Sequence, residues 1–237
     1  MSDQRLFQRP HHQRIASVLE ALDAPLLLRH RCLFGGGTAV ALRYGEYRES
    51  VDVDFVVSDV AGYRELRQLL TGAQGVQAIV RPGATLQALR ELRADQYGLR
   101  TVLQVDGTQV KFEIVLEGRI ELDPPEADDI VCGVAALTRL DMATTKLLAN
   151  SDRWADDSVF SRDLIDLAMM QPKGKLLKQA VAKAGAAYGA SIERDLAKAV
   201  DHLLGREGRL ERCMTAMQIN VPRALLWQRI KALRPAK

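Results

Sequence analysis

The sequence predicts an α+β protein whose first part holds strands and helices and whose second part is α-helical. Three observations support this. Residues 51–55 alternate between apolar and acidic side chains, as in a half-buried strand. Two strand-like runs, 97–105 and 109–116, are joined through Asp106-Gly107, a strong hairpin signal. After Pro124-Pro125, the regular segments all have helical spacing.

The proline pair also predicts the domain boundary. Residues 122–130 form an acidic connector in which regular structure stops. We therefore expect a catalytic core at 1–130 and an α-helical domain at 131–237 that completes the active site and carries a basic surface. The first part should contain helices at 9–22, 59–70 and 85–93 and a strand at 76–80. The second part should contain helices at 138–149, 159–170, 176–187, 192–204 and 221–233.

Charge is distributed unevenly over the 237 residues. The net charge is only +3, yet residues 171–237 contain 14 Lys and Arg against 5 Asp and Glu. A basic part joined to an acidic one suits an enzyme that acts on a polyanion, although basic surface helices are also common without that role. No apolar run is long enough to cross a bilayer, and the N-terminus lacks the apolar centre of a secretory signal. We expect a cytoplasmic protein without a membrane partner.

A glycine turn is the first candidate for chemistry. Gly35-Gly36-Gly37-Thr38 follows a short apolar strand at 31–34 and opens a helix that extends to about residue 44. Glycines allow positive φ and a close approach of a bulky anion to the backbone N–H groups. The unpaired N–H groups of a helix N-terminus favour phosphate. Such a turn alone is more often purely structural.

A carboxylate pair follows the turn. Asp52 and Asp54 occupy alternate positions of one strand, so their side chains lie side by side and repel unless a cation lies between them. A hard divalent ion with oxygen ligands is the natural occupant, and Mg²⁺ held together with the phosphates of a nucleotide fits best. A phosphate turn followed by a metal-binding pair is typical of a site that transfers a nucleotidyl group.

These residues also carry a family resemblance. The pattern of Gly36-Gly37-Thr38, a helix, and then Arg48, Ser50, Asp52, Asp54 and Phe55 resembles the nucleotidyltransferase superfamily, and more narrowly the AbiEii/AbiGii abortive-infection toxins. The resemblance implies a polymerase-β-like core, with a mixed sheet flanked by helices. It also implies ATP or another NTP and Mg²⁺ as cosubstrates and, in some relatives, transfer to tRNA.

The resemblance implies a third metal ligand on a later strand. Lys111-Phe112-Glu113-Ile114 matches that position, so Glu113 is the favoured ligand beside Asp52 and Asp54. Glu117 and Asp106 are its competitors. From the residues alone, Glu113 on the face opposite Phe112 would more simply form a surface ion pair with a lysine.

A second motif lies in the helical part. The resemblance matches Lys146 on one helix and Arg162, Asp163 and Asp166 on the next. It implies that Lys146 contacts the nucleotide phosphates and that Asp163 completes the active site as a base or by orienting the lysine. Asp166 could be structural. Without the resemblance, Lys146 would be a surface lysine and Asp163 an intrahelical ion-pair partner.

The expected function is Mg²⁺-dependent transfer of NMP from an NTP to an acceptor hydroxyl on RNA, in particular a tRNA-like acceptor, by the toxin of a toxin–antitoxin or abortive-infection pair. Gly36, Gly37, Thr38 and Lys146 would bind the nucleotide, and a cognate antitoxin is a possible partner. Two alternatives remain open from the sequence. One is a small-molecule, antibiotic-type nucleotidyltransferase, and the other is a non-catalytic binding protein with this fold.

Overall fold

The computed structural model describes residues 7–234. Its contacts form two compact units. The sheet unit comprises residues up to 43 together with 50–138, and the helical unit comprises 44–49 together with 139 onward. In the part of the chain that is described, no helix is both long and apolar enough to cross a membrane.

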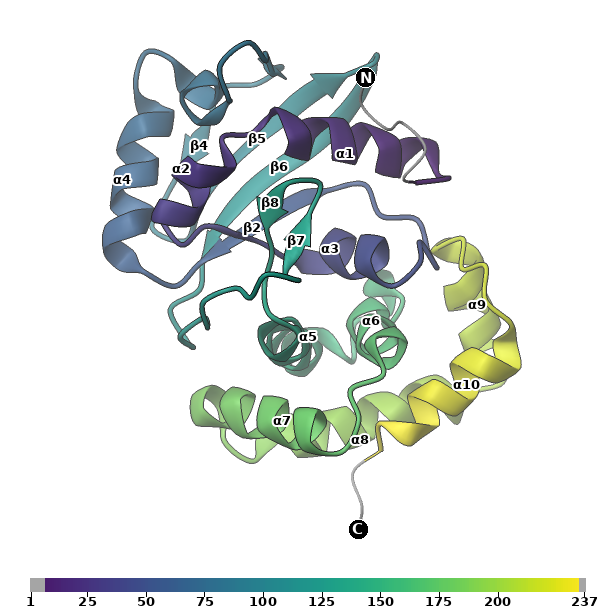
Figure 1. Cartoon of the computed structure of the whole chain (residues 1–237). Helices are drawn as coiled ribbons and strands as arrows, with labels where there is room; N and C mark the ends of the chain where they lie inside the picture. The colour runs from purple at the N-terminus through teal and green to yellow at the C-terminus, as the bar shows by residue number, and fades with distance from the viewer. Residues whose placement is uncertain (1–6, 235–237) are drawn as a thin grey trace. The chain divides into compact units, whose positions relative to one another are not determined.

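A mixed sheet is the centre of the sheet unit (Figure 1). Its strand order is β1-β2-β6-β5-β3, and β4 also pairs with β5. The β2–β6 pair is parallel, whereas β1–β2 and β5–β6 are antiparallel. The strands are β1 (Leu33–Phe34), β2 (Val53–Val57), β3 (Gln87–Ala88), β4 (Arg93–Ala94), β5 (Gly98–Val105) and β6 (Thr108–Leu116); a separate two-stranded sheet pairs β7 (Ile130–Val131) with β8 (Val134–Ala135).

The apolar face of this sheet forms the core. Val53, Phe55 and Val57 of β2 are fully buried. The Phe55 ring centroid lies 5.6 Å from that of Phe34 in β1 and 5.8 Å from that of Phe112 in β6. The expected β5–β6 hairpin is confirmed, with positive φ at both Asp106 and Gly107, as a two-residue turn of this type requires. The opposite face of β2 and β6 therefore carries the polar positions.

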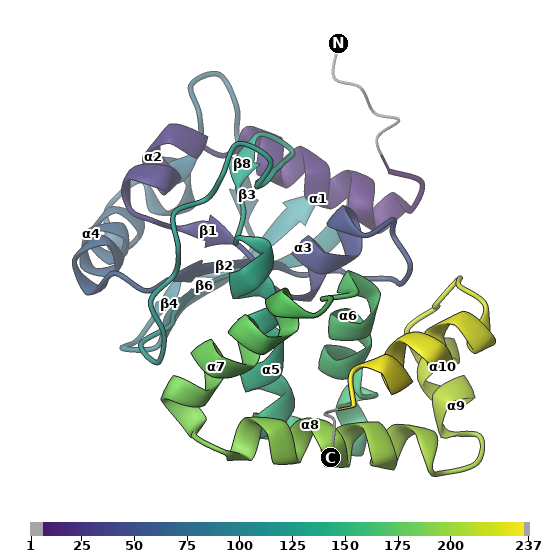
Figure 2. The ribbon, with the colours of Figure 1, turned by 60° about the horizontal axis from the view of Figure 1, so that its bottom comes forward.

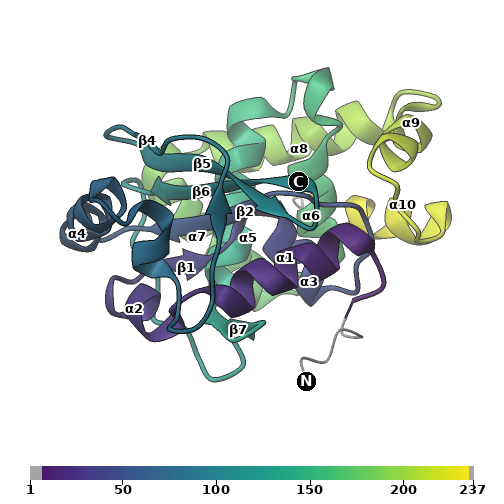
Figure 3. The ribbon, with the colours of Figure 1, turned by 90° about the horizontal axis from the view of Figure 1, so that it is seen from above.

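Helices cover the sheet unit. They are α1 (Pro10–Ala21), α2 (Ala24–Arg29), α3 (Gly36–Arg43) and α4 (Val60–Thr71), with a short 3-10 helix at Gly75–Ile79. Figures 1 and 3 show α1 lying across one face of the sheet, where its Ile15, Val18 and Leu19 are fully buried. Asp59 caps α4, because its carboxylate accepts a hydrogen bond from the Gly62 N–H at 2.8 Å.

Two predicted elements in this unit are wrong. Residues 85–93 are not a helix but contain β3 and lead into β4, both paired with β5. The Leu89 N–H donates to the Val102 carbonyl at 2.8 Å, and the Leu89 side chain is exposed. The leucines of this segment therefore do not form a buried helix face. The backbone N–H and C=O groups pair with the edge of β5 instead. Residues 76–80, predicted as a strand, lie mainly in the 3-10 helix.

The helical unit packs its helices around α5 and α6. Figure 2 shows these two helices side by side, with α7 next to α5 and α10 next to α6. The elements are α5 (Arg139–Arg153), a 3-10 turn (Asp157–Val159), α6 (Arg162–Met170), α7 (Lys175–Tyr188), α8 (Ser191–Leu204), α9 (Arg209–Ala216) and α10 (Arg223–Ala232). The sequence predicted five of these helices, with ends shifted by a few residues, and missed α9.

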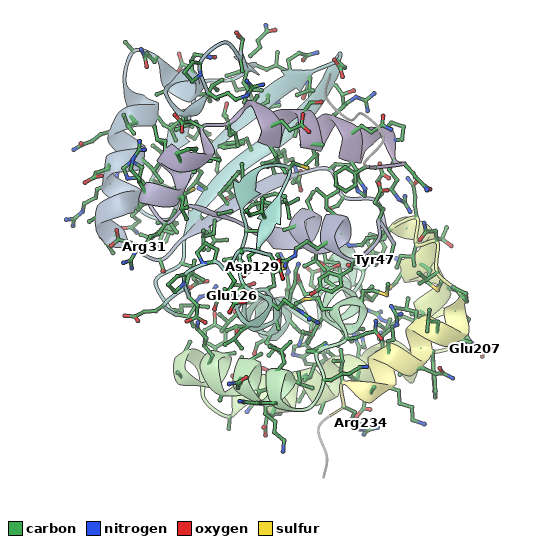
Figure 4. All side chains as sticks on the ribbon, viewed as in Figure 1. Arg31, Tyr47, Glu126, Asp129, Glu207 and Arg234 are labelled. Atoms are coloured by element: carbon green, nitrogen blue, oxygen red, sulfur yellow. The ribbon has the colours of Figure 1, made fainter. Side chains whose placement is uncertain are left out.

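A short segment between α3 and β2, residues 44–49, belongs to the helical unit. The Glu49 N–H donates to the Met217 carbonyl at 3.0 Å, and the Asn220 N–H donates to the Tyr47 carbonyl at 3.0 Å. The Tyr47 side chain, labelled in Figure 4, is 1% exposed. The chain therefore contributes to the helical unit before it forms β2.

Candidate active site

The glycine turn lies directly against Asp54. The Gly35 N–H donates to the Asp54 carbonyl at 2.9 Å, and α3 begins at the next residue. Gly36 has a φ of +68°, and a Cβ atom added to it would lie 2.8 Å from the Asp54 Cβ. Only glycine fits here, because any side chain would collide with Asp54 and strain the backbone. The structure thus brings the predicted phosphate turn and one predicted carboxylate together.

Asp54 and Glu113 are neighbours across two strands. In the parallel β2–β6 pair, Asp54 is in register with Glu113, so the two carboxylates lie on the same face of the sheet. The adjacent pair, Val53 and Phe112, is buried on the apolar face. Asp54 and Glu113 are half-buried on the polar side. Asp52 lies just before β2, two residues from Asp54, and is also half-buried.

Glu113 has a cationic partner in the structure, and it is an arginine rather than the neighbouring lysine. Arg100 of β5 is in register with Glu113 and its Nε donates to the Glu113 carboxylate, while its Nη1 lies 2.9 Å from Asp95. Burial lowers the pKa of Arg100, but Glu113 and Asp95 outweigh that effect and raise it. Glu113 therefore stands between a carboxylate on β2 and a guanidinium on β5.

The two competitors of Glu113 lie elsewhere. Glu117 is buried beyond the end of β6, and both of its carboxylate oxygens accept hydrogen bonds from Arg119, at 2.6–2.9 Å. Asp106 is exposed in the turn of the β5–β6 hairpin. Neither is in register with a residue of β2.

The carboxylates fit a magnesium ion that is shared with a nucleotide. Among residues 7–234, no three His, Cys, Asp or Glu side chains form a complete metal site. Mg²⁺ seldom uses an all-protein cage, however, and is commonly held by one or two carboxylates together with substrate phosphates. Asp54 and Glu113 supply such oxygen donors next to the turn at Gly36.

Thr38 and Arg43 stabilise α3 within the sheet unit. The Thr38 side chain is 1% exposed, and its hydroxyl shares a 2.8 Å hydrogen bond with that of Ser50. Arg43, at the C-terminal end of the helix, lies 2.9 Å from the Asp129 carboxylate and donates to the Leu137 carbonyl at 3.0 Å. The Thr38 hydroxyl thus has a partner inside the unit, whereas Gly36 and Gly37 are half-buried at the start of α3.

Lys146 is the centre of a buried charge network in the helical unit. Its side chain is 7% exposed, and its Nζ lies 3.1 Å from the Asp163 carboxylate and 2.7 Å from that of Asp166. Arg153, at the end of α5, binds Asp163 through Nε at 2.6 Å and Nη2 at 3.0 Å. The structure therefore places Lys146 in contact with both aspartates of the motif, Asp163 and Asp166.

Asp166 links this network to the segment 44–49. Arg48 binds both oxygens of the Asp166 carboxylate, through Nε at 2.7 Å and Nη2 at 2.9 Å, and the Tyr47 hydroxyl donates to it at 2.6 Å. Asp166 is fully buried and Arg48 is 5% exposed. Such two-pronged arginine–carboxylate contacts fix geometry as well as charge.

The network controls the protonation of its members. Burial by itself would raise the pKa of Asp163, but Lys146 and Arg153 outweigh it and hold that pKa well below its usual value. Burial likewise opposes ionisation of Asp166, and Arg48 and Lys146 lower its pKa. Burial and the nearby Asp166 charge raise the pKa of Tyr47. Both carboxyl groups are therefore ionised, and Tyr47 is neutral, near pH 7.

Three members of this network were given no role from the sequence. Arg48 was noted only as part of a motif, and Tyr47 and Arg153 were not considered. A signal for Arg153 was present, since Lys146 and Arg153 are seven residues apart on one helix and so lie on the same face. Arg162, which the motif includes, is exposed.

Comparisons with known proteins match most of the chain. A family model described as the nucleotidyl transferase AbiEii toxin of a type IV TA system matches residues 18–233. A "putative nucleotidyltransferase" of known structure from Helicobacter pylori is 18% identical, with a TM-score of 0.51, over 99% of this chain and 96% of that one. JHP933 from Helicobacter pylori is 15% identical, with a TM-score of 0.50, over 96% and 93% of the two chains. No curated protein matches the sequence.

The two solved structures establish the fold alone, because their sequences are distant. The family match is the stronger finding, since it spans most of the chain, including the glycine turn, the carboxylates of β2 and β6, and the Lys146 network. The expected resemblance is confirmed: this chain belongs to the AbiEii family of nucleotidyl transferase toxins, and it is a nucleotidyltransferase.

Proposed function

We propose that this protein transfers NMP from an NTP to an acceptor hydroxyl on RNA, in a reaction that depends on Mg²⁺. The observation that carries the proposal is the registered pair of Asp54 and Glu113 beside the glycine turn at Gly36. The family's type IV toxin–antitoxin system supports a nucleotide substrate and a cognate antitoxin. The RNA acceptor is supported by the excess of 14 Lys and Arg over 5 Asp and Glu in residues 171–237.

Each residue of the sheet unit has a proposed task. The N–H groups at the start of α3, at Gly36 and Gly37, would bind the triphosphate. Asp54 and Glu113 would hold Mg²⁺ together with the nucleotide phosphates, and Asp52, two residues from Asp54, is the third ligand proposed from the sequence. Arg100 would orient the Glu113 carboxylate from the far side. When bound, the ion would neutralise phosphate charge and favour deprotonation of the acceptor hydroxyl. Thr38 would act by positioning the turn through Ser50.

The helical unit supplies the remaining proposed groups. By the family resemblance, Lys146 would neutralise charge on the nucleotide phosphates and Asp163 would complete the active site. Within its own unit the Lys146 side chain is held by two ionised carboxylates, so its direction is fixed before any nucleotide binds. This preorganisation suits a group that acts electrostatically.

Asp54→Asn tests the proposal. Substitution of residues that hydrogen-bond to metal ligands often lowers metal affinity or activity about 10–100-fold. Substitution of a ligand itself should therefore lower NMP transfer by more than about 100-fold. The assay incubates the protein with each labelled NTP, Mg²⁺ and total RNA, and asks which nucleic acid becomes labelled. Circular dichroism should show an unchanged fold, since Asp54 is on the polar face of the sheet.

Asp106→Asn is the matched control. It makes the same chemical change in the same unit, at an exposed turn where asparagine is well tolerated, and should leave transfer unchanged. Full activity of Asp54→Asn would contradict the metal assignment. Turnover of NTP that labels no RNA and is insensitive to salt would instead favour a small-molecule acceptor.

A further inference from the structure

The helical unit contains a cavity that the proposed chemistry does not use. Its volume is about 610 Å³, within the range of small-ligand sites. Four parts of the unit line it, namely the segment 44–49, the start of α5, the end of α6 and the connection to α7. The lining residues are Tyr44, Arg139, Met170, Gln171, Lys173 and Leu176.

The cavity is positively charged. Arg139 and Lys173 line it, no acidic residue does, and neither cation forms an ion pair within residues 7–234. Arg139 is the first residue of α5, and Lys173 lies two residues before the start of α7. A cation at a helix N-terminus opposes the helix dipole, so these charges do not serve helix stability. Together with the N-terminal N–H groups they favour an anion.

The cavity lies at one end of a row of cationic side chains along α5. Arg139, Lys146 and Arg153 are spaced by seven residues on α5, so they share one face and are successively about 10 Å apart along the helix. Asp163 and Asp166 of α6 neutralise Lys146 and Arg153. The next position along that face of α6 is Met170, which is apolar and lines the cavity. Arg139 is therefore the member of the row without a carboxylate partner.

Tyr44 gives the cavity an aromatic surface that is held in place. Three residues further on, Tyr47 and Arg48 are buried and bound to Asp166. The backbone of Tyr47 and Glu49 is hydrogen-bonded to residues 217–220. A ring on an anchored segment can stack on a ligand with little loss of conformational entropy.

We propose that this cavity binds a nucleotide unit of the RNA acceptor, with phosphate at Arg139 and Lys173 and a base stacked on Tyr44. Cations combined with an aromatic platform are the means by which proteins bind single-stranded nucleic acid without reading its sequence. The assignment to RNA rests on the proposed function, whereas the preference for a phosphate with a planar base follows from the lining itself.

The experiment measures binding of a fluorescent single-stranded RNA of about 12 nucleotides by anisotropy, without NTP or Mg²⁺. Arg139→Ala with Lys173→Ala should raise the Kd and reduce the slope of log Kd against log salt by about 0.7 for each lost phosphate contact. Tyr44→Ala should raise the Kd at least about fivefold, while Tyr44→Phe, which keeps the ring, should restore binding.

Lys178→Ala is the matched control, because Lys178 is exposed on α7 but does not line the cavity. Its Kd should stay close to that of the unchanged protein. An equal rise in the Kd for RNA in Lys178→Ala and in Lys173→Ala would show that binding depends on general positive charge, which would overturn the proposal. A Kd that is unchanged in the double variant would also overturn it. Displacement of the RNA by excess ATP alone would assign the cavity to free nucleotide and also overturn it.

The same experiment separates this inference from the proposed function. Binding of RNA that depends on Arg139 and Tyr44, without NMP transfer, would contradict the proposed reaction and leave the cavity assignment intact. NMP transfer to RNA with a KM for RNA that is unaffected by these substitutions would contradict the cavity assignment and leave the proposed reaction intact. Because neither side chain is buried in the core, both variants should fold.

Discussion

Asp166 is the residue on which the buried charges of the helical unit converge. Its carboxylate accepts from Tyr47, binds Arg48 twice and lies 2.7 Å from Lys146. A buried carboxylate is tolerated only when its oxygens are fully satisfied. With three partners, Asp166 fixes the position of Lys146 relative to the segment 44–49.

Asp163 provides a direct measure of what this network contributes. We expect Asp163→Asn to lower the free energy of unfolding by about 3 kcal/mol at pH 7, because Arg153 and Lys146 lose their shared buried partner. Urea unfolding followed by circular dichroism measures the change. The exposed neighbour variant Arg162→Ala should change stability by less than about 0.5 kcal/mol. Equal effects of the two substitutions would contradict a role for the network.

The pH dependence of the same variant tests the ionisation of Asp163. Its pKa in the folded protein lies below the ordinary value of about 3.9, so its ionised form stabilises the fold above that pH and this contribution is lost as pH falls toward the folded pKa. The stability difference between the unchanged protein and Asp163→Asn should be constant from about pH 7 to 5 and should narrow below about pH 4. If this difference in the free energy of unfolding is the same at pH 3 as at pH 7, the ionised Asp163 carboxylate is not the source of the stabilisation.

At the scale of elements, the glycine turn before α3 packs against β2, and Gly36 lies directly against Asp54. We expect Gly36→Ala to abolish NMP transfer and to destabilise the fold, since its Cβ would collide with Asp54. Gly45→Ala is the comparison, because Gly45 has a φ of +86° but open space around it. It should cost only about 1–2 kcal/mol of left-handed strain and leave transfer intact. Similar activity in the two variants would contradict the close contact.

Local signals predicted elements well where they matched the final packing. The Asp106-Gly107 turn and the alternation in β2 each acted through residues close in sequence. Residues 85–93 failed because the spacing of their leucines indicated a helix, while β5 offered an open edge that sequence spacing does not reveal. α9, of 8 residues, was missed.

At the scale of the whole molecule, the predicted site residues belong to both units. Gly36, Asp54 and Glu113 are in the sheet unit, and Lys146 and Asp163 are in the helical unit. The sequence indicated the glycine turn and Asp54 together, and the family resemblance added Glu113; parallel register brings the two carboxylates together. The predicted two-residue turn at Asp106-Gly107 fixes the register that sets Arg100 opposite Glu113, so this pair could have been read from the sequence. The contact between Arg48 and Asp166 could not, since it joins residues 118 positions apart. Roles in the reaction for Lys146 and Asp163 stay predictions from the family pattern.

The division into units predicts the behaviour of a fragment. A fragment of residues 139–237 lacks Tyr47 and Arg48, so Asp166 would keep Lys146 but lose two of its three partners. We expect the fragment to unfold at a lower urea concentration than the full chain. Asp166→Asn should lower the free energy of unfolding by about 3 kcal/mol in the full chain but by under about 1 kcal/mol in the fragment, because Tyr47 and Arg48 are already missing there.

Circular dichroism in urea gives all four free energies of unfolding, and Arg162→Ala in both backgrounds is the control for a general loss of stability. The same cost of Asp166→Asn in the fragment and in the full chain would show that the segment 44–49 adds nothing to the helical unit.

The path of the chain at 44–49 has a consequence for recombination between relatives. The polypeptide passes from one unit to the other three times, near residues 43, 49 and 138, so no single cut separates them. A chimaera that exchanges everything after 138 would join a foreign helical part to the native segment 44–49, so that Arg48 would face a residue of the relative in place of Asp166. Functional hybrids of this enzyme will need a second, much earlier crossover that carries Tyr44 to Glu49 with the helices they belong to.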